Sequence, residues 1–349
     1  MGIEMSSVLK AIENRNLDLE KTEFYAAIIG ESPSKGAKSP SLWNEAFKGF
    51  NLSGFMHPMD VNSDKLPKVV QCLRKDQRFI GGAVTMPYKI SIVPYLDSLE
   101  PEAEMIGAVN CIYRNGEELI GSNTDGAGAL WSLKEAMSGT LSGNTALLLG
   151  AGGAGFAVAS YLASELGSQG CLKIANRSPQ TRENLAARLL NKCRVEQIDW
   201  PISTDDVRDI DILINCTSIG FETIKEDSKG AFCLLFYTPL GPTDNNIRIK
   251  DTKDFKKKYL KAASDAIKSN LNHSLDVFAA MNDPIIFDII YQPDQTLFLS
   301  LSKLFGYKTI NGISMNLEQA VIAFKRAVSA SGIYDPKDSK IRRLMQKVW

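Results

Sequence analysis

Histidine is scarce in this 349-residue chain, which holds only His57 and His273. Acid/base chemistry therefore needs another carrier, and dehydrogenases built on a catalytic histidine or a zinc ion are disfavoured. The six cysteines are scattered without a C-x-x-C pair, and several stand inside apolar runs that are typical of strands. This pattern favours buried thiols in a reducing compartment over a disulfide frame or a zinc site, so we expect no metal and a cytoplasmic location.

Net charge is absent as well, because 40 basic residues balance 40 acidic residues. No overall field draws the chain to nucleic acid or to an anionic membrane. No run approaches the ~18 uncharged apolar residues of a membrane span. Hydrophobic residues nonetheless make up 44% of the chain, and the length suggests about two domains. We expect a small-molecule partner and a monomer or a homodimer.

Alternating strand and helix patterns predict the fold class. The strand-like runs "FYAAIIG", "SGFMHPMDV" and "FIGGAVTM" alternate with the helical patterns "SPSLWNEAFKGF" and "DKLPKVVQCLRKD". This order predicts an α/β fold with a mainly parallel sheet that is covered on both faces. A second unit starts near Asn123 and contains a strand, a glycine turn and a helix in "TALLLGAGGAGFAVASYLASEL". Residues 1–21 are expected to form a helical N-terminal extension.

A long stretch between Gly220 and Asp288 interrupts the second unit. Connections in such units are usually ~2–6 residues long, whereas this stretch carries a helical pattern of its own from Asp254 to Ser269. We interpret residues 222–283 as an insertion that lies on the surface beside the nucleotide unit and outside the chemistry. The run "AFCLLF" within it is expected to form a further strand.

Three glycines, Gly150, Gly152 and Gly155, form the pattern G-x-G-x-x-G. The pattern follows the apolar strand Thr145–Leu149 and opens a helix of small residues, which is the context of a dinucleotide-binding turn. Glycines allow the tight turn and the close approach of a pyrophosphate, and the N–H groups at the helix start hold its charge. The alternative is a glycine-rich turn without a ligand.

The end of the next strand predicts which dinucleotide binds. An acidic residue usually stands there when the ligand is NAD. This chain has Asn176, Arg177 and Ser178, followed by Arg182, and no carboxylate at the strand end. Two guanidiniums and a hydroxyl group suit a 2′-phosphate, which arginine can bind with two hydrogen bonds, so the pattern favours NADP. The alternative is a pair of surface arginines at a helix start.

A lysine and an aspartate near the join of the two predicted units are the candidates for acid/base chemistry. Lys89 ends the block "AVTMPYK", and Asp125 lies in "SNTDGAG". If they meet, the carboxylate can orient the ammonium while the lysine exchanges a proton with a substrate hydroxyl or carbonyl, as hydride transfer requires. Spacing alone leaves open a structural salt bridge or two unrelated surface charges.

Nine blocks in one order give the chain a resemblance to a known family. They are "KSPSLWN", "AVTMPYK", "IGAVN", "SNTDGAG", "GAGGAG", "NRS", "NCTSIG", "DIIYQPDQT" and "NGISMNLEQAVIAF". From about Ala26 to Phe324, apart from the insertion, the chain resembles the shikimate dehydrogenase family, which includes shikimate and quinate dehydrogenases. The resemblance implies an N-terminal α/β substrate-binding domain over 22–125, to which 316–349 return, and a Rossmann NADP-binding domain over 126–315.

The resemblance also implies roles for single residues and an activity. Lys89 and Asp125 are implied as the catalytic pair. Substrate contacts are implied for Ser39, Thr85, Asn110, Tyr291 and Gln319. Cofactor contacts are implied for Gly150, Ala151, Gly152, Gly153, Ala154, Thr217, Ser218, Ile289, Gly312 and Met315. The implied reaction is the NADP-dependent interconversion of a ring alcohol and a ketone in a small cyclic hydroxy-acid, with shikimate and 3-dehydroshikimate as the first candidates.

The block "GAKSP" departs from the family pattern H-S-x-S-P, whose two serines bind the substrate carboxylate. Gly36 and Ala37 replace the histidine and the first serine, so only Ser39 remains, and Lys35 and Lys38 are alternative cations. These changes leave open a relative that acts on quinate, an aminated shikimate or another hydroxy-acid. A non-catalytic ligand sensor is a further alternative, which the retention of both the lysine and the aspartate disfavours.

Overall fold

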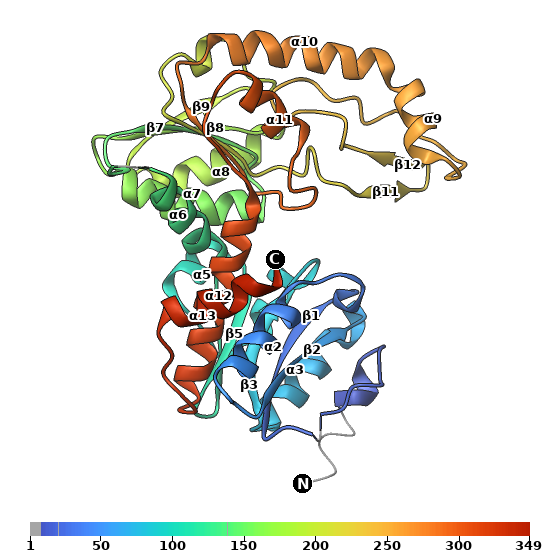
Figure 1. Cartoon of the computed structure of the whole chain (residues 1–349), viewed down its shortest axis with the longest axis vertical. Coiled ribbons are helices and arrows are strands. Elements are labelled where there is room, and N and C mark those ends of the chain that lie inside the picture. The colour runs from blue at the N-terminus through green and yellow to red at the C-terminus, as the bar shows by residue number, and fades with distance from the viewer. Residues whose placement is uncertain (1–7, 20, 138) are drawn as a thin grey trace. The chain divides into compact units, whose positions relative to one another are not determined.

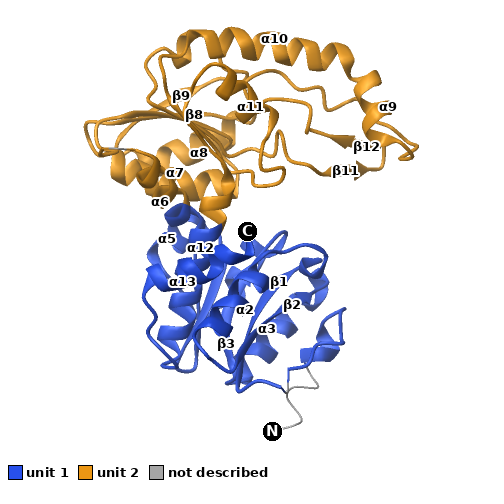
Figure 2. Cartoon of the chain, viewed as in Figure 1, with its two compact units in different colours: residues 1–128, 317–349 blue, residues 129–316 orange. Residues whose placement is uncertain are grey.

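The computed structural model describes residues 8–19, 21–137 and 139–349 and divides the chain into two compact units. The first unit comprises Met1–Gly128 together with Leu317–Trp349, and the second comprises Ala129–Asn316 (Figure 2). The helices α6 (Asp125–Ala136) and α12 (Gly312–Ala330) contain the two points at which the chain passes from one unit to the other. Within the described residues, no helix is both long and apolar enough to cross a membrane.

Among the described residues of the expected N-terminal helix, only a short segment is helical. Residues 1–7 and 20 of that extension lie outside the described residues, residues 8–11 are helical, and residues 14–19 have no regular secondary structure. The prediction of a helix is therefore wrong for the second half of the extension. Burial of Val8, Ile12 and Leu19 in a core of the first unit holds this segment in place instead.

The first unit contains a six-stranded sheet in the order β2-β1-β3-β5-β6-β4. Its strands are β1 (Phe24–Gly30), β2 (Gly54–Asp60), β3 (Phe79–Val84), β4 (Ser98–Leu99), β5 (Cys111–Asn115) and β6 (Glu118–Ser122). β1 pairs in parallel with β2 and β3, whereas β5 pairs antiparallel with β3 and β6 (Figure 1). Besides α12, this unit contains the helices α2 (Ser39–Gly49), α3 (Leu66–Lys75), α4 (Tyr88–Ser91), α5 (Pro101–Ile106) and α13 (Asp338–Met345).

Alternation along β1 explains why helices cover both faces of this sheet. Every residue of the strand is buried, and successive side chains enter two different cores, one with α3 and the other with α2, α12 and α13. A strand that is apolar at every position needs a cover on each side, because its side chains point alternately to opposite faces. On one side, Trp43 and Phe47 of α2 pack against Phe324 of α12, with ring centroids 5.2 and 5.0 Å away.

The second unit contains a parallel sheet in the order β14-β13-β10-β7-β8-β9. Its strands are β7 (Thr145–Leu149), β8 (Cys171–Ala175), β9 (Arg194–Ile198), β10 (Ile212–Asn215), β13 (Ile285–Asp288) and β14 (Thr309–Ile310). The helices α7 (Gly153–Leu166) and α8 (Pro179–Leu189) lie on one side of it, and α10 (Ser264–Ala280) and α11 (Leu297–Leu304) on the other (Figure 1). This is a doubly wound Rossmann arrangement, and the predicted α/β class is confirmed.

The insertion forms elements of its own outside the main sheet. β11 (Ile224–Asp227) and β12 (Gly230–Cys233) make an antiparallel hairpin that pairs with no other strand of the described chain, and α9 (Phe255–Ala262) precedes α10. The predicted helix over 254–269 is therefore two helices that meet at Ala263, and only the start of "AFCLLF" is a strand. A small core with Tyr237, Phe255 and Tyr259 holds these pieces together.

Candidate active site and nucleotide site

Lys89 and Asp125 meet within the first unit. Lys89 lies in the short helix α4, and Asp125 is the first residue of α6. The Lys89 ammonium donates to Asp125 Oδ2 over 2.6 Å, with the lysine side chain 33% and the aspartate side chain 13% exposed. A carboxylate at the first turn of a helix is favoured by the unpaired N–H groups there. The Asp125 carboxylate is therefore held in place, while the Lys89 side chain remains accessible to a ligand.

Asn110 locks the aspartate into a polar cluster. Its Nδ2 donates to Asp125 Oδ1 over 2.7 Å and to Thr124 Oγ1 over 3.1 Å, and its Oδ1 accepts from the Thr124 backbone N–H over 2.7 Å. Gln319 Oε1, from α12, lies 3.5 Å from both Asn110 Nδ2 and Thr124 Oγ1. The chain thus brings together Lys89, Asp125, Asn110 and Gln319, and it adds Thr124, which sequence reasoning missed although it precedes the aspartate.

The other expected substrate residues, Thr85, Ser39 and Tyr291, lie at separate elements. Thr85 lies beside the end of β1, since its Cγ2 is only 2.3 Å from where a Cβ at Gly30 would stand. Ser39 is buried at the start of α2. Tyr291 belongs to the second unit and follows β13. All three residues stand near the ends of helices or strands, and their role in binding the substrate stays a prediction.

Ala37 and its flanking lysines give that loop an unusual character. The Ala37 methyl group packs against the core formed by α2, α12 and α13. Lys35 and Lys38 are exposed, and the Lys38 ammonium lies over the Trp349 ring at 5.5 Å from its centroid. A lysine that rests on an aromatic face at the surface is stabilised there by a cation–π contact. The geometry therefore favours surface roles for the lysines.

The glycine turn after β7 has the shape that a pyrophosphate needs. Gly150 adopts a φ of +96°, which favours glycine. A Cβ at Gly155 would stand 1.9 Å from the Gly150 carbonyl oxygen, so only glycine permits this approach of helix to strand. A Cβ at Gly152 or Gly153 would meet no described atom within 4 Å. The start of α7, with Ala154 in its first turn, is thus open, and it matches the site for a phosphate group.

The end of β8 separates the two arginines. Asn176 Oδ1 accepts from the Ala151 backbone N–H over 3.0 Å, and Ser178 caps α8. Arg182 donates to the Ile198 carbonyl and to an Asp199 carboxylate oxygen, both over 2.7 Å. The exposed Arg177, by contrast, lines a pocket and forms no ion pair with any described residue. The structure thus leaves Arg177 available for an anion and engages Arg182 with β9.

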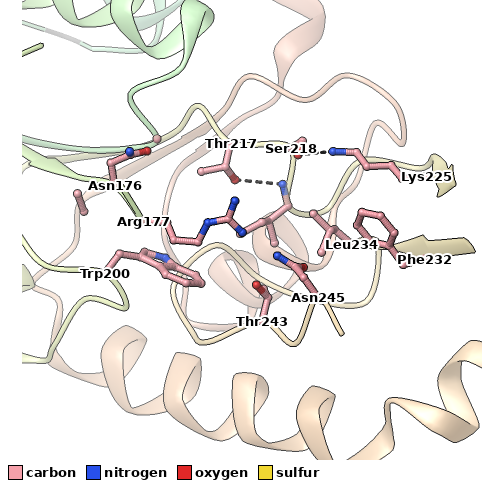
Figure 3. A pocket seen from close by; sticks show the side chains of 13 residues that line it. Asn176, Arg177, Trp200, Thr217, Ser218, Lys225, Phe232, Leu234, Thr243 and Asn245 are labelled. Atoms are coloured by element: carbon pink, nitrogen blue, oxygen red, sulfur yellow. Dashed lines mark hydrogen bonds between the residues drawn. The ribbon is translucent and has the colours of Figure 1, made fainter. Parts of the chain in front are cut away.

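Thr217 and Ser218 follow β10 and border the same pocket. Thr217 Oγ1 donates to Asn215 Oδ1 over 2.7 Å and accepts from the Ile219 backbone N–H over 3.1 Å. The pocket has a volume of about 250 Å³ and opens at the carboxyl ends of β7, β8 and β10 (Figure 3). Ligands of open parallel sheets bind at that edge. The volume suits part of a dinucleotide, because pockets for a whole drug-sized ligand measure ~300–1,000 Å³.

Three further residues expected at the cofactor come together beside β13. A Cβ at Gly312 would stand 2.0 Å from the Ile289 carbonyl oxygen, and the Gly312 N–H donates to the Ile290 carbonyl over 3.0 Å. Met315 is buried in a core that Ile289 also contacts. Gly312 is therefore required for the close approach of α12 to this strand end, and Met315 has a packing role whatever else it does.

Asp288 is a buried carboxyl at the end of β13. It accepts from Thr296 Oγ1 over 2.7 Å, from Asn215 Nδ2 over 3.0 Å and from the Ile290 N–H over 3.1 Å. Burial raises the pKa of Asp288 to about 6, although each of these hydrogen bonds acts to lower it. This network joins the ends of β10 and β13 and so braces the sheet edge beside the pocket.

These features fit NADP as the ligand of the second unit. The tight turn at Gly150 and the open helix start at Gly152 suit a pyrophosphate, and Arg177, which has no ion pair with a described residue, suits a 2′-phosphate. No acid that could bind a ribose 2′-hydroxyl stands at the end of β8, which reads Asn176, Arg177, Ser178. Within the described part of the chain, no group of three His, Cys, Asp or Glu side chains could hold a metal ion.

Comparisons with known proteins agree with this geometry. A sequence model described as "Shikimate dehydrogenase substrate binding domain" matches residues 28–112. The shikimate dehydrogenase (NADP(+)) of Carboxydothermus hydrogenoformans is 34% identical over 308 residues, which cover 87% of this chain and 91% of that protein. The enzyme of the same name from Bartonella tribocorum is 30% identical and covers 89% of this chain and 91% of that protein. A crystal structure of a shikimate dehydrogenase in complex with NADP+ is 26% identical, with a TM-score of 0.68 over 93% of this chain and 95% of that one.

Proposed function

Because this chain belongs to the shikimate dehydrogenase family, we propose that it oxidises a ring alcohol and reduces the matching ketone of a small cyclic hydroxy-acid with NADP(H). The observation that carries the proposal is the Lys89–Asp125 pair, 2.6 Å apart in a cluster of amide and hydroxyl groups. Shikimate and 3-dehydroshikimate are the first candidates for the substrate pair. The enzyme is an NADP-dependent oxidoreductase.

Lys89 handles the proton in this proposal. NADP(H), when bound, supplies or accepts the hydride. During reduction, the Lys89 ammonium gives a proton to the carbonyl oxygen as negative charge develops on it, and during oxidation the neutral amine takes the hydroxyl proton. Asp125 holds the nitrogen in position and stabilises its positive charge. Asn110 keeps the carboxylate in place by its hydrogen bond to the other oxygen.

The substrate residues are proposed from the same unit. Amide and hydroxyl groups of Ser39, Thr85, Asn110 and Gln319 suit a ring that carries several hydroxyl groups, because neutral hydrogen bonds recognise it without a charge. Tyr291 is proposed as a further contact. The glycine turn, Arg177, Thr217 and Ser218 are proposed to hold the adenosine and phosphate parts of the cofactor, and Ile289, Gly312 and Met315 to border the nicotinamide.

The Ala37 position favours a second candidate substrate. A methyl group that packs against a core cannot donate the hydrogen bond that a serine gives to a ring carboxylate. A relative that acts on quinate, an aminated shikimate or another hydroxy-acid therefore remains in the proposal. A steady-state assay of NADPH formation with shikimate, quinate and a panel of hydroxy-acids tests both candidates. Failure of every cyclic hydroxy-acid in that assay would overturn the proposed function.

A further inference from the structure

The insertion forms one wall of the pocket at the strand ends. Thirteen residues line this pocket, and five of them come from the insertion: Lys225, Phe232, Leu234, Thr243 and Asn245 (Figure 3). The remaining residues belong to the Rossmann frame, among them Gly150, Asn176 and Arg177. The insertion, expected to lie beside the nucleotide unit, thus also lines a pocket with its hairpin and the loop that follows, and its place outside the chemistry stays a prediction.

The pocket is cationic on two sides. Arg177 reaches into it from the end of β8, and Lys225 points to Ser218 from β11, with Nζ donating to Ser218 Oγ over 3.0 Å (Figure 3). Neither cation forms an ion pair with a described residue, and no acidic residue is among those that line the pocket. Some other cations of the insertion are paired with acids, as Arg248 is with Asp227 over 3.0 Å. Two unneutralised cations at one half-enclosed pocket attract an anion.

The hairpin fixes how its residues face the pocket. Lys225 and Phe232 are directly opposite each other in the β11–β12 pairing, and both line the pocket, so their shared face is turned to it. The hairpin is tied to the frame at its start, where the Glu222 N–H donates to the Gln292 carbonyl over 3.1 Å. Trp200 Nε1 donates to the Pro239 carbonyl over 2.9 Å, which joins the loop after β9 to the insertion. Hydrogen bonds thus join the wall to the rest of the unit.

Asn245 brings a further polar side chain of the insertion to the pocket. Asn245 Oδ1 is buried and accepts no hydrogen bond from any described residue. A buried acceptor without a donor is costly, and a donor group of a ligand in the pocket would satisfy it. Trp200, Phe232 and Leu234 line the same pocket with apolar and aromatic surface. Such walls accommodate a flat base, and the exocyclic amino group of adenine is a suitable donor.

We propose that the insertion completes the adenosine 2′-phosphate site of NADP, with Lys225 binding the 2′-phosphate beside Arg177 and Asn245 binding the adenine amino group. The inference rests on the proposed NADP function. It assigns Lys225 to the 2′-phosphate because the adenosine ribose lies at the end of the second strand of such a sheet, here β8, whereas the pyrophosphate lies at the helix start after the first. The insertion is thus a determinant of cofactor choice.

The test of Lys225 compares two ligands that differ by one phosphate. Binding of adenosine 2′,5′-bisphosphate and of 5′-AMP is titrated by calorimetry on the full chain and on Lys225→Ala, with Lys229→Ala as a control for charge, since Lys229 is exposed in the turn of the same hairpin. Lys225→Ala is expected to raise the Kd for the bisphosphate about tenfold or more and to leave 5′-AMP unchanged. Lys225→Arg should restore tight binding, because it keeps the charge.

The outcomes separate this inference from the proposed function. If Lys225→Ala and Lys229→Ala both bind the bisphosphate as tightly as the unaltered chain while Arg177→Ala does not, the role of Lys225 is overturned and the NADP site stands. If the unaltered chain shows no preference for the bisphosphate over 5′-AMP, the NADP function itself fails. A thermal melt of each variant, with Lys225→Gln as a second replacement, ensures that lost binding is not lost folding.

The test of Asn245 compares NADP with its hypoxanthine analogue, which carries a carbonyl oxygen in place of the adenine amino group. The unaltered chain is expected to bind NADP more tightly than the analogue, because two acceptors then face each other in the analogue's complex. Asn245→Ala should bind both dinucleotides alike, and its Kd for NADP should rise. An unchanged preference for NADP in Asn245→Ala would remove this residue from the site.

Discussion

The Lys89 ammonium nitrogen lies 2.6 Å from Asp125 Oδ2, although the two residues stand 36 positions apart in the chain. The other carboxylate oxygen is occupied by Asn110 Nδ2 at 2.7 Å. With both oxygens engaged, the carboxylate serves to hold and stabilise the lysine, and the lysine is the group that meets the substrate. The acid/base role of this pair can be tested without altering the cofactor site.

We expect Lys89→Ala to lower kcat by roughly 10²–10⁴, the usual span for a lost acid/base group. The Kd for NADP should stay unchanged, because Lys89 belongs to the first unit and the glycine turn to the second. Asp125→Asn should also lower kcat, since it removes the charge that orients the ammonium. Steady-state kinetics with a parallel NADP titration measures both quantities. Lys68→Ala, on the exposed side of α3, is the matched control, and equal kcat in Lys68→Ala and Lys89→Ala would contradict the mechanism.

Arg177→Ala should weaken NADP far more than NAD. Arg177 borders the pocket without an acidic partner among the described residues, and a charge-assisted hydrogen bond contributes about 1.5–3 kcal/mol, or at least about tenfold in Kd. Arg182→Ala is the control, because that guanidinium already donates to the Ile198 carbonyl and Asp199. Binding titrations with both dinucleotides decide the matter. An equal loss of NADP and NAD affinity in Arg177→Ala would rule out a 2′-phosphate contact.

The two glycines of the turn should respond differently to alanine. Gly155→Ala is expected to lower the melting temperature, because its Cβ would stand 1.9 Å from the Gly150 carbonyl oxygen. Gly152→Ala should leave the melting temperature intact, since its φ is −73° and no described atom lies within 4 Å of the added Cβ. It should instead raise the Kd for NADP and NAD alike by about tenfold, because the methyl group enters the space for the pyrophosphate. Thermal melts and titrations on the same samples distinguish the two effects.

Ala37→Ser should improve shikimate as a substrate. The added hydroxyl group restores a donor for the ring carboxylate, which is expected to lower KM about ten- to a hundredfold at unchanged NADP affinity. Lys38 rests on the Trp349 ring, so Lys38→Ala should change KM little. A large rise of KM in Lys38→Ala or Lys35→Ala, with no gain in Ala37→Ser, would show that a lysine binds the carboxylate instead. If none of these substitutions alters the KM for shikimate, the substrate is a compound other than shikimate.

Asp288 should make the stability of the chain fall as the pH rises from about 4 to about 6. Burial raises its pKa from 3.8 to about 6, so in this window the folded state holds a proton that the unfolded state has lost. The contribution of Asp288 to the free energy of unfolding is largest below pH 4, and it decreases by up to about 3 kcal/mol as the pH passes 6. Urea melts over this range should show a flatter profile in Asp288→Asn than in the unaltered chain. Parallel profiles for the two proteins would contradict the assignment.

Local sequence signals determined much of the fold. The apolar runs that became β1, β3, β7 and β10 were readable because a strand buried on both faces is apolar at every position. The glycine turn was readable because tight backbone geometry restricts the residue type at Gly150 and Gly155. β9, with the sequence "RVEQI", was missed, since an edge strand alternates polar and apolar residues and has only one buried face.

The sequence by itself determined the fold class, the dinucleotide turn and the preference for a 2′-phosphate, because each depends on neighbouring residues of one strand–turn–helix segment. Only the tertiary structure decided which polar groups meet. Gln319 lies close to Asn110, 209 positions away in the chain, because α12 returns to the first unit. Arg177 rather than Arg182 borders the pocket, because Arg182 is hydrogen-bonded to the Ile198 carbonyl of β9. The insertion shows the same limit, since the pairing that turns Lys225 and Phe232 to the pocket depends on hairpin register and long-range anchoring, which no local pattern encodes.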